Sequence, residues 1–376
     1  DAGIYLTRPT RAGCGACHDR TWFGDPSATP EGFENHPMDF NQPDDSGCAG
    51  CHPATAPGAA PISEAHKMPK DFSPGLNLNI TNVATAAGPA PGGILVTITF
   101  TMADGAGAPI TDPAAAGASI GAILAWPATE YQDYVAASNI TAAKTVINNG
   151  DGSYVYAFTN PVSDAAGSYA VAMQGRITFQ HDGANVQTGT TSNGLTFFQA
   201  DGSPAEPRRT VVTDAKCMDC HEDIRAHGSQ RFGVGECLLC HNVNETDIPY
   251  RDDSDEVHQK VDAVTVNFKD MIHRIHTGEE LQSADGYTVI GYRGTPYDFT
   301  EVRFPGDRRQ CTICHEEGTY GLPLPAEASP TTVDNTVTEP VTVLPTRAAC
   351  TSCHDSLVTN RSEEHTSELQ SHLKLV

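Results

Sequence analysis

The chain has 376 residues, with 47 acidic side chains against 23 lysines and arginines, and a formal net charge of −24. This length allows two or three domains with sizeable cores. The acidic surface excludes nucleic acid and an anionic membrane face as partners, because both would repel it, and favours a cation, a mineral or a basic protein. There is no apolar run that could span a bilayer and no basic and apolar signal after Asp1, so we expect a processed or fragmentary start.

The first segment, residues 1–71, contains two copies of the motif C-x-x-C-H, and four more copies follow later in the chain. All 12 cysteines fall into these pairs, and a histidine directly follows each pair. The six motifs are Cys14/Cys17 with His18, Cys48/Cys51 with His52, Cys217/Cys220 with His221, Cys237/Cys240 with His241, Cys311/Cys314 with His315, and Cys350/Cys353 with His354.

Each motif predicts one covalently bound c-type haem. Cysteines at i and i+3 lie on one side of a helical turn and can form thioethers to the two vinyl groups of one haem, and the next histidine supplies an axial nitrogen to the iron. Disulfides or structural zinc would give no reason for a histidine at the same offset six times. We therefore expect six c-type haems, whose attachment requires export of the chain.

Six histidines outside the motifs are candidates for the second axial position. Two follow the first two motifs and four lie among the last four: His36, His66, His227, His258, His273 and His276. His227 lies six residues beyond His221 in a stretch of helical character. His258 lies in the charged run "RDDSDEVHQK", which a solvated surface segment would also explain.

Residues 72–205 have no cysteine and alternate in polarity with a period of two. In "ILVTITFTM" the residues Val96, Ile98, Phe100 and Met102 share one face and threonines share the other. The segments "SIGAILAW", "NNGDGSYVYAF" and "SYAVAM" repeat this pattern between turn signals. The segment predicts an antiparallel β-sandwich or small barrel without haem. His181, beside "HDGAN", is expected to be a solvated turn residue.

Residues 206–360 contain the last four motifs and the stretch "FKDMIHRIHTGEE", residues 268–280. On a helix, His273 and His276 lie on one face about one turn apart, so the two rings can reach two closely stacked haems. Met271, Ile272 and Ile275 supply apolar contacts for the porphyrins. A zinc site of the H-x-x-H type lacks its further ligands in this stretch, so we expect two distal ligands to different haems.

The last segment, residues 361–376, contains "RSEEHTSELQSH", which is similar to the translation of a sequencing-library adapter. We expect it to be an artefactual tail, which excludes His365 and His372 as ligands and predicts that the natural chain continues past about residue 360.

The stretch from Leu76 to Ser356 resembles the OmcA/MtrC family of outer-membrane multihaem cytochromes. The resemblance rests on the β segment with "NNGDGSYVYAF", then "RRTVV", "CMDCHEDIRAHGSQRFGVGECLLCHN", "FKDMIHRIHTGEE", "VRFPGDRRQCTICH" and "CTSCHD". It implies a β domain followed by a five-haem domain, at or beyond the outer membrane, passing electrons to extracellular metal oxides, flavins or partner cytochromes. Here four motifs follow the β segment, as in a truncated five-haem domain. The two motifs of residues 1–71 end an upstream haem domain or form a separate extension.

The expected fold is mixed, with an antiparallel β domain flanked by haem-packed, mostly irregular and short-helical segments. The leading hypothesis for function is an electron relay through closely spaced bis-histidine haems, since two histidine ligands leave no open position for a substrate. Membrane association would come through parts outside this chain, and a periplasmic location is the alternative to the outer-membrane surface. A multihaem reductase of nitrite, hydroxylamine or a sulfur oxyanion is the alternative function. A third hypothesis makes the β domain a binding module, but its sequence offers no ligand site.

Overall fold

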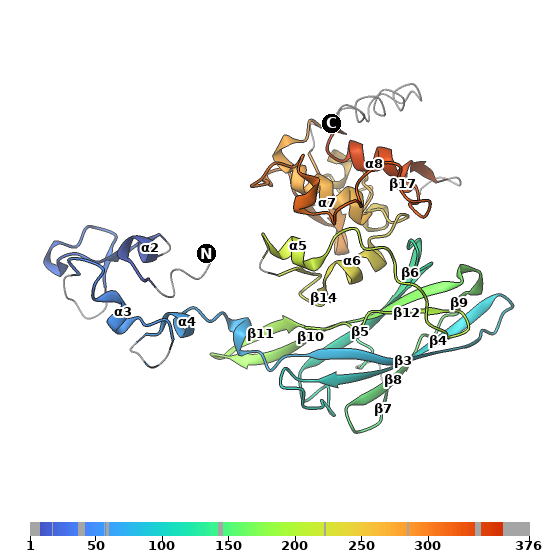
Figure 1. Cartoon of the computed structure of the whole chain (residues 1–376), viewed down its shortest axis with the longest axis horizontal. Coiled ribbons are helices and arrows are strands. Elements are labelled where there is room, and N and C mark those ends of the chain that lie inside the picture. The colour runs from blue at the N-terminus through green and yellow to red at the C-terminus, as the bar shows by residue number, and fades with distance from the viewer. Residues whose placement is uncertain are drawn as a thin grey trace. The chain divides into compact units, whose positions relative to one another are not determined.

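The computed structural model describes residues 8–16, 18–36, 42–55, 57, 60–141, 146–221, 223–283, 286–334 and 340–355. The chain divides into two compact units (Figure 1). The first consists of Asp1–Ser73 with His181–Val186, and the second of Pro74–Gln180 with Gln187–Val376. The first division lies close to the predicted boundary between residues 71 and 72.

The first unit is built from short elements with little side-chain core. Among its described residues, Ile62 is the one large apolar side chain that is buried. Strand β1 pairs with β2 in parallel. The elements are α2 (Arg11–Gly15), β1 (Thr21–Trp22), η1 (Pro26–Ala28), β2 (Glu34–Asn35), α3 (Cys48–Cys51), α4 (Ile62–Ala65) and η2 (Pro69–Phe72).

The β domain consists of two five-stranded sheets. One has the strand order β3-β4-β8-β7 with β9 beside β4, and the other has the order β11-β10-β5-β6 with β12 beside β10. The strands of the first are β3 (Asn77–Ala87), β4 (Gly93–Ala103), β7 (Val146–Asn148), β8 (Ser153–Ala157) and β9 (Val162–Ser163). Those of the second are β5 (Ala118–Trp126), β6 (Asp133–Ala137), β10 (Ser168–His181), β11 (Ala184–Gly189) and β12 (Thr196–Gln199), and the turn η3 (Asp164–Ala166) precedes β10.

Both sheets contribute side chains to one hydrophobic core. Ile98 and Phe100 of β4 are fully buried in it together with Leu124 of β5 and Val171 of β10. In β4 buried and partly exposed residues alternate along the whole strand. The pairings β3/β4, β4/β8, β5/β6 and β5/β10 are antiparallel, so the prediction of an antiparallel β domain is confirmed.

Strand β5 departs from the predicted alternation because both of its faces are covered. Ile123 and Ala125 point away from the first core and join a second cluster with Leu239 of helix α6 (Val234–Cys240). Six consecutive residues of β5 are therefore buried. A sheet that is covered on both faces reads as a nearly continuous apolar run, and here the second cover is the helix that carries the fourth motif (Figure 1).

The rest of the second unit consists of short helices, hairpins and irregular chain. The longest helix among its described residues, α7 (Phe268–Thr277), has 10 residues. The other helices are α5 (Asp214–Met218), η4 (Ile248–Tyr250), η5 (His258–Lys260), η6 (Gly278–Glu280), η7 (Tyr292–Gly294), η8 (Cys311–Ile313) and α8 (Pro345–Thr351). The strand pairs are β13 (Arg225–Ala226) with β14 (Arg231–Phe232), β15 (Thr288–Gly291) with β16 (Thr295–Asp298), and β17 (Thr331–Asp334) with β18 (Val341–Val343).

Hydrogen bonds join this segment to the β domain. The amide of Gly175 in β10 donates to the carbonyl of Gln230 at 3.0 Å, and Asn193 Nδ2 donates to Glu236 Oε2 of α6 at 3.2 Å. The segments before and after the predicted boundary at residues 205/206 thus belong to one compact unit.

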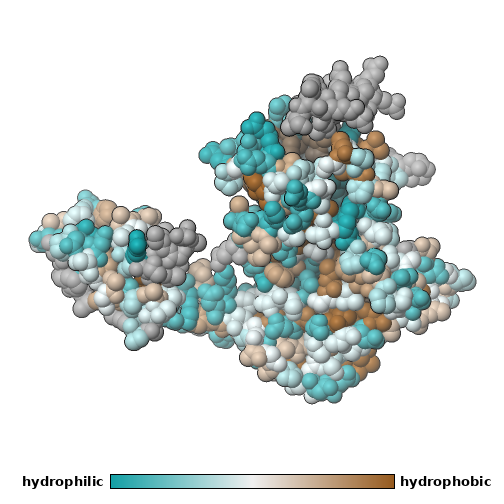
Figure 2. Space-filling model, viewed as in Figure 1, coloured by the Kyte–Doolittle hydropathy of each residue, from teal (hydrophilic) through white to brown (hydrophobic). Residues whose placement is uncertain are grey.

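On the face drawn in Figure 2, hydrophilic and intermediate residues predominate and hydrophobic residues occur in scattered patches. Within the described ranges, no helix combines the length and apolar character needed to cross a membrane.

Candidate functional site

All six C-x-x-C-H motifs adopt the same local turn. In each, the amide of the histidine donates to the carbonyl oxygen of the first cysteine four residues earlier. These N–O distances are 2.8 Å for His18, 2.9 Å for His52, His221 and His241, 2.8 Å for His315 and 3.0 Å for His354. An i+4 hydrogen bond is one turn of α-helix, which supports the predicted arrangement of two cysteines on one side and a histidine after them.

Short helices create these turns. The motifs lie on or directly after α2, α3, α5, α6, η8 and α8. In α2 the helix begins at a threonine cap, because Thr10 Oγ1 accepts a hydrogen bond from the amide of Gly13 at 3.0 Å. Helices this short are unstable by themselves, so their stability must come from what packs against them.

The predicted haem-attaching cysteines differ in how far they are buried. Cys240 is buried, but Cys220 and Cys311 are exposed, contrary to what an enclosed cofactor site would show. Helix α5 ends at Met218, so Cys220 lies in the turn that follows, where its amide donates to the carbonyl of Cys217 at 3.1 Å. A thioether requires that the sulfur can reach a vinyl group at the edge of the porphyrin, and this does not depend on burial. The attachment of Cys220 to haem therefore stays a prediction.

The histidine rings lie in pairs. Five motif histidines each face a histidine from outside the motifs, with nearly equal separations of the ring centres. The pairs are His18 with His66 at 6.1 Å, His52 with His36 at 5.9 Å, His221 with His276 at 6.0 Å, His241 with His227 at 5.9 Å, and His315 with His273 at 5.9 Å.

This separation fits one iron between two imidazoles. A metal–imidazole bond is about 2 Å long and the ring centre lies about 1 Å beyond the nitrogen, so two ligands on opposite sides place their ring centres roughly 6 Å apart. Aromatic rings that contact each other directly, by stacking or edge to face, have ring-centre separations that vary over a wider range. Five pairs within 0.2 Å of one another therefore fit bis-histidine haem ligation.

Four of the paired rings are oriented by backbone carbonyls. Nδ1 lies 3.0 Å from Ala60 O in His52, 2.8 Å from Ile62 O in His66, 2.9 Å from Val266 O in His241, and 2.9 Å from Ile272 O in His276. A carbonyl only accepts, so Nδ1 must carry the proton, and the lone pair is then on Nε2. Such bonds hold metal-binding histidines in orientation and raise their basicity.

The electrostatic environment favours neutral rings and neutral sulfur. Burial lowers the pKa of His227 and of His273 to about 4, so both rings are uncharged at neutral pH and able to bind a metal. Burial also raises the thiol pKa of Cys237 and Cys240 to about 12. A thiolate ligand for zinc would be costly at this site, whereas a thioether carries no charge.

Helix α7 connects all four C-terminal motifs. At its start the amide of Phe268 donates to the carbonyl of His241 at 2.9 Å. His273 then pairs with His315 and His276 with His221. At its end Thr277 Oγ1 lies 3.3 Å from Cys353 Sγ.

The expected helix is present, and its two histidines face different motifs. Arg274 is held by Asp270, with Nε 2.7 Å from the carboxylate, and its guanidinium lies over Tyr287.

His227 faces His241 from a turn and not from the helical stretch that we expected. The turn joins β13 to β14, and His227, Gly228 and Ser229 all have positive φ, at 54°, 69° and 63°. Consecutive left-handed residues reverse the chain and cannot continue a helix. The strain at the two non-glycine residues is tolerated because the turn is anchored to β10 through Gln230, and it is typical of a functional position.

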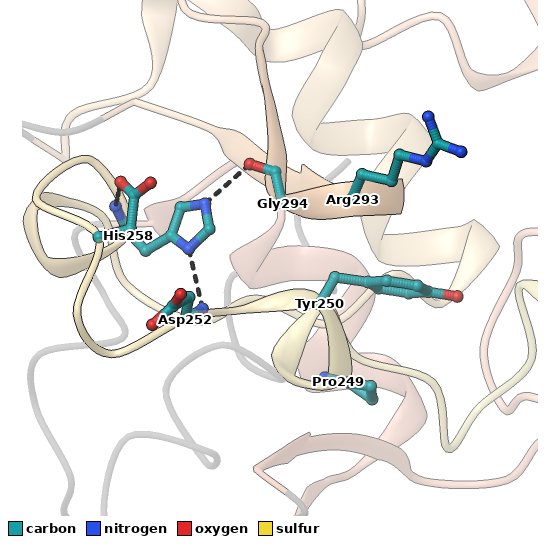
Figure 3. Close-up of a pocket in the computed structure, with 7 residues that line it drawn as sticks. Pro249, Tyr250, Asp252, His258, Arg293 and Gly294 are labelled. Carbon is teal, nitrogen blue, oxygen red and sulfur yellow. Dashed lines mark hydrogen bonds between the residues drawn. The ribbon is translucent and has the colours of Figure 1, made fainter.

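His258 is placed differently from the other candidates. Its ring is buried, Nδ1 accepts from the amide of Asp252 at 2.9 Å, and Nε2 lies 2.8 Å from the carbonyl of Gly294 (Figure 3). Both nitrogens are engaged, so neither is available to iron in this arrangement. In the structure His258 joins two loops at the edge of a surface pocket of about 350 Å³, which Tyr250 and Arg293 also line, and its assignment as a haem ligand stays a prediction.

His354 and His181 form no ring pair with another histidine in the described part of the chain. His354 closes the sixth motif. His181 was expected to be a solvated turn residue, yet its ring stacks on Phe72 with centres 4.1 Å apart. The predicted tail, with His365 and His372, lies outside the described residues.

Other metal chemistry finds little support. Within the described ranges there is no group of three or more His, Cys, Asp or Glu side chains that could hold a metal ion. The 11 described cysteines form no disulfide in the structure. Cys17 lies outside the described residues.

Three basic residues that the motif analysis did not single out lie on the segments that carry His273 and lead to the bridge with His315. Arg208 and Arg209 both contact the carboxylate of Glu130, and Lys269 lies on α7 one turn before His273. We call Arg208, Arg209 and Lys269 the cation cluster. The signal in the sequence was weak, since a pair of arginines and a lysine are usually solvated surface residues.

Comparison with protein families gives one match. Residues 209–374 match the family described as outer membrane cytochrome MtrC/MtrF-like, domains II/IV. The match confirms the resemblance inferred from the motifs. A comparison with curated proteins finds no match.

Proposed function

Because residues 209–374 belong to the MtrC/MtrF-like outer membrane cytochrome family, we propose that the chain is a multihaem electron relay. The observation that carries the proposal is the set of five histidine pairs with ring centres 5.9 to 6.1 Å apart. Haem, when bound, supplies a one-electron iron couple. The motif cysteines would hold it covalently, and the paired histidines would bind its iron and keep substrates from it.

The spacing of the motifs supports a relay. The third and fifth motifs are in contact, because Lys216 Nζ donates to the carbonyl of Thr312 at 2.8 Å. Helix α7 adds contacts to the fourth and sixth motifs. Four haems held around one helix of 10 residues would lie close together, as electron transfer between them requires.

We further propose that the protein is exported and works at the outer-membrane surface or outside the cell. Its electron acceptors or donors would be metal oxides, flavins or partner cytochromes, as in the family that it resembles. The net charge of −24 favours cationic mineral surfaces and basic patches of partner proteins over anionic ones.

Haem counting and reoxidation test the proposal together. Denaturing mass spectrometry of the exported chain should find six haem additions, and fewer than five would contradict the assignment. Mixing the fully reduced protein with a ferric oxide should then oxidise the entire haem absorbance. If most of the haem absorbance stays reduced, the haems are not connected and the relay is wrong.

A second candidate function is reduction of a small oxyanion or of hydroxylamine, and His354 is the reason to keep it. This motif histidine has no histidine opposite it in the described ranges, so its haem is the one for which an open axial position can be argued. A high-spin haem signal in the electron paramagnetic resonance (EPR) spectrum, abolished by nitrite or hydroxylamine, would favour this function. An entirely low-spin spectrum would exclude it.

A further inference from the structure

Glu130 holds two members of the cation cluster, Arg208 and Arg209, through its carboxylate. Arg208 Nη2 lies 3.0 Å from Glu130 Oε1, and Arg209 contacts the other carboxylate oxygen. The side chains of Glu130 and Arg208 are each only 12% exposed, so the network is largely shielded from water.

The chain then runs from Arg209 directly to the fifth motif. Val211 accepts a hydrogen bond from the amide of Glu316 at 2.9 Å, and Val212 forms a β-bridge with His315. Arg209 and Arg208 therefore lie three and four residues before Val212, the residue that pairs with His315.

Lys269 lies one helical turn before His273, and Arg208 and Arg209 are among the charges that act on its ammonium group. It lies four residues before His273 on α7, and residues at i and i+4 share a helix face. It is half-buried and forms no hydrogen bond or ion pair within 4 Å to any described residue. Burial lowers its pKa, which means that its charge is poorly compensated at this position.

The cation cluster carries more positive charge than Glu130, the carboxylate that both of its arginines contact. The cluster brings three cations to a single carboxylate, Glu130, although the whole chain carries a net charge of −24. Asp270 also favours the charged form of Lys269, but its carboxylate is shared with Arg274, which lies 2.7 Å away. Glu316, next to His315, accepts from Thr213 Oγ1 at 2.9 Å. A half-buried ammonium beside two guanidinium groups is costly unless a further anion binds there.

The ligands of this pair also differ from those of its neighbours. The Nδ1 atoms of His273 and His315 are buried and have no hydrogen-bond partner in the described part of the chain. In the two neighbouring pairs, His241 and His276 each have Nδ1 within 2.9 Å of a carbonyl. Imidazoles without such an acceptor are less basic and donate less electron density to iron.

We propose that the cation cluster binds the propionate carboxylates of the haem held by His273 and His315, and that this haem is the most readily reduced of those in the C-terminal segment. The inference rests on the proposed haem ligation. Nearby positive charge stabilises the iron after it gains an electron, and the less basic ligands act in the same direction. Electrons entering the segment would collect at this haem.

The test uses the full-length holoprotein with Lys269→Gln, which removes one charge without breaking an ion pair. The control is Lys260→Gln, which removes the same charge from an exposed position. His273→Met identifies the haem, because a thioether ligand raises the potential of its iron. In a spectroelectrochemical titration, His273→Met should raise the reduction potential of one haem, and Lys269→Gln should lower the potential of that same haem. Lys260→Gln should leave all the potentials unchanged.

The outcomes separate this inference from the proposed function. If His273→Met raises the potential of one haem but Lys269→Gln changes no potential, or that of a different haem, His273 is a ligand and the proposed role of the cluster is wrong. If His273→Met moves no haem, the ligation fails and the inference fails with it.

A dissolved anion could supply the same carboxylate or phosphate chemistry, so a second arm distinguishes the source. The wild-type potential of this haem should stay constant when phosphate replaces chloride at constant ionic strength. A shift with phosphate would mean that a free anion occupies the cluster, which would overturn the assignment to propionates.

Discussion

The β domain and the motif-bearing segments obtain their cores in different ways. In the β domain, Ile98, Phe100, Leu124 and Val171 are fully buried against one another across two sheets. The first unit, by contrast, buries one large apolar side chain, Ile62, among its described residues. Its histidine rings instead lie in pairs separated by the width of a metal centre. One region is stabilised by its side chains, and we propose that the other is stabilised by the haems that its motifs would hold.

This difference explains why the two regions have such different sequences. A side-chain core requires periodic apolar residues, and strand β4 has them at every second position. A segment that packs on porphyrin requires only cysteines, histidines and scattered apolar contacts at suitable positions. Its helices can then be as short as the 4 residues of α3.

Removing the haems should have the largest effect, and it should destabilise the motif-bearing segments but not the β domain. In a chain produced without haem attachment, we expect the amides of α7 to lose their protection from hydrogen exchange, because four motifs no longer hold the helix. The central amides of β4 should keep theirs. Hydrogen exchange with mass spectrometry measures both in one sample, with the holoprotein as control. Protection of α7 without haem would contradict the proposed difference in cores.

A cavity in the core of the β domain should destabilise that domain and leave the haem sites unchanged. Phe100→Ala removes a fully buried ring and should destabilise the β domain by about 3–5 kcal/mol. The haem absorption bands should stay unchanged at temperatures where the domain is folded. Urea unfolding followed by circular dichroism gives the stability, and Ile147→Ala, at a 64% exposed position, is a control expected to stay within about 0.5 kcal/mol. Equal effects of the two substitutions would argue against this core.

Glu236, where the two regions meet, should give a smaller effect that depends on pH. Burial raises its pKa from 4.5 to about 7, and this effect outweighs the two hydrogen bonds that Oε2 accepts from the Phe232 amide and Asn193 Nδ2, which lower it; Oε1 is buried without a hydrogen-bond partner in the described chain. The folded state therefore favours the protonated acid. Its contribution to stability is complete below pH 4.5 and is lost as the pH rises through 7.

Between pH 5 and pH 8 the unfolding free energy of the wild type should fall by about 2 kcal/mol relative to that of Glu236→Gln. Urea unfolding at both pH values measures this difference. Glu256→Gln, at an exposed position, should parallel the wild type. If the unfolding free energy of Glu236→Gln changed with pH as that of the wild type does, Glu236 would not be buried in the folded protein.

The sequence predicted those features that depend on local spacing. The alternation in "ILVTITFTM" indicated the buried face of β4, and the spacing of His273 and His276 indicated one helix face. It did not predict the second buried face of β5, because the cover comes from α6, more than 100 residues later. Local pattern contains no information about such a partner.

The same limit applied to the ligand pairs. The motifs identified the proximal histidines, but which distal ring meets which motif depends on the tertiary fold, as with His276 and His221. His258 had the same residue type in the same neighbourhood, and only its two hydrogen bonds distinguish it from a ligand. The cation cluster was missed for the same reason, since Arg208 and Lys269 meet only in the folded chain.

The central claim is that one helix supplies distal ligands to two haems, and EPR spectra of histidine variants test it most directly. The His273 and His315 planes are inclined by 25°, whereas those of His276 and His221 are inclined by 70°. Nearly parallel imidazole planes give a rhombic low-spin signal, and nearly perpendicular planes give a highly anisotropic one. His273→Ala should therefore remove one rhombic signal and His276→Ala one anisotropic signal, with mass spectrometry verifying that all haems remain attached. The double variant should lose both; the loss of a single low-spin signal would show that the two histidines serve one site and would contradict the account.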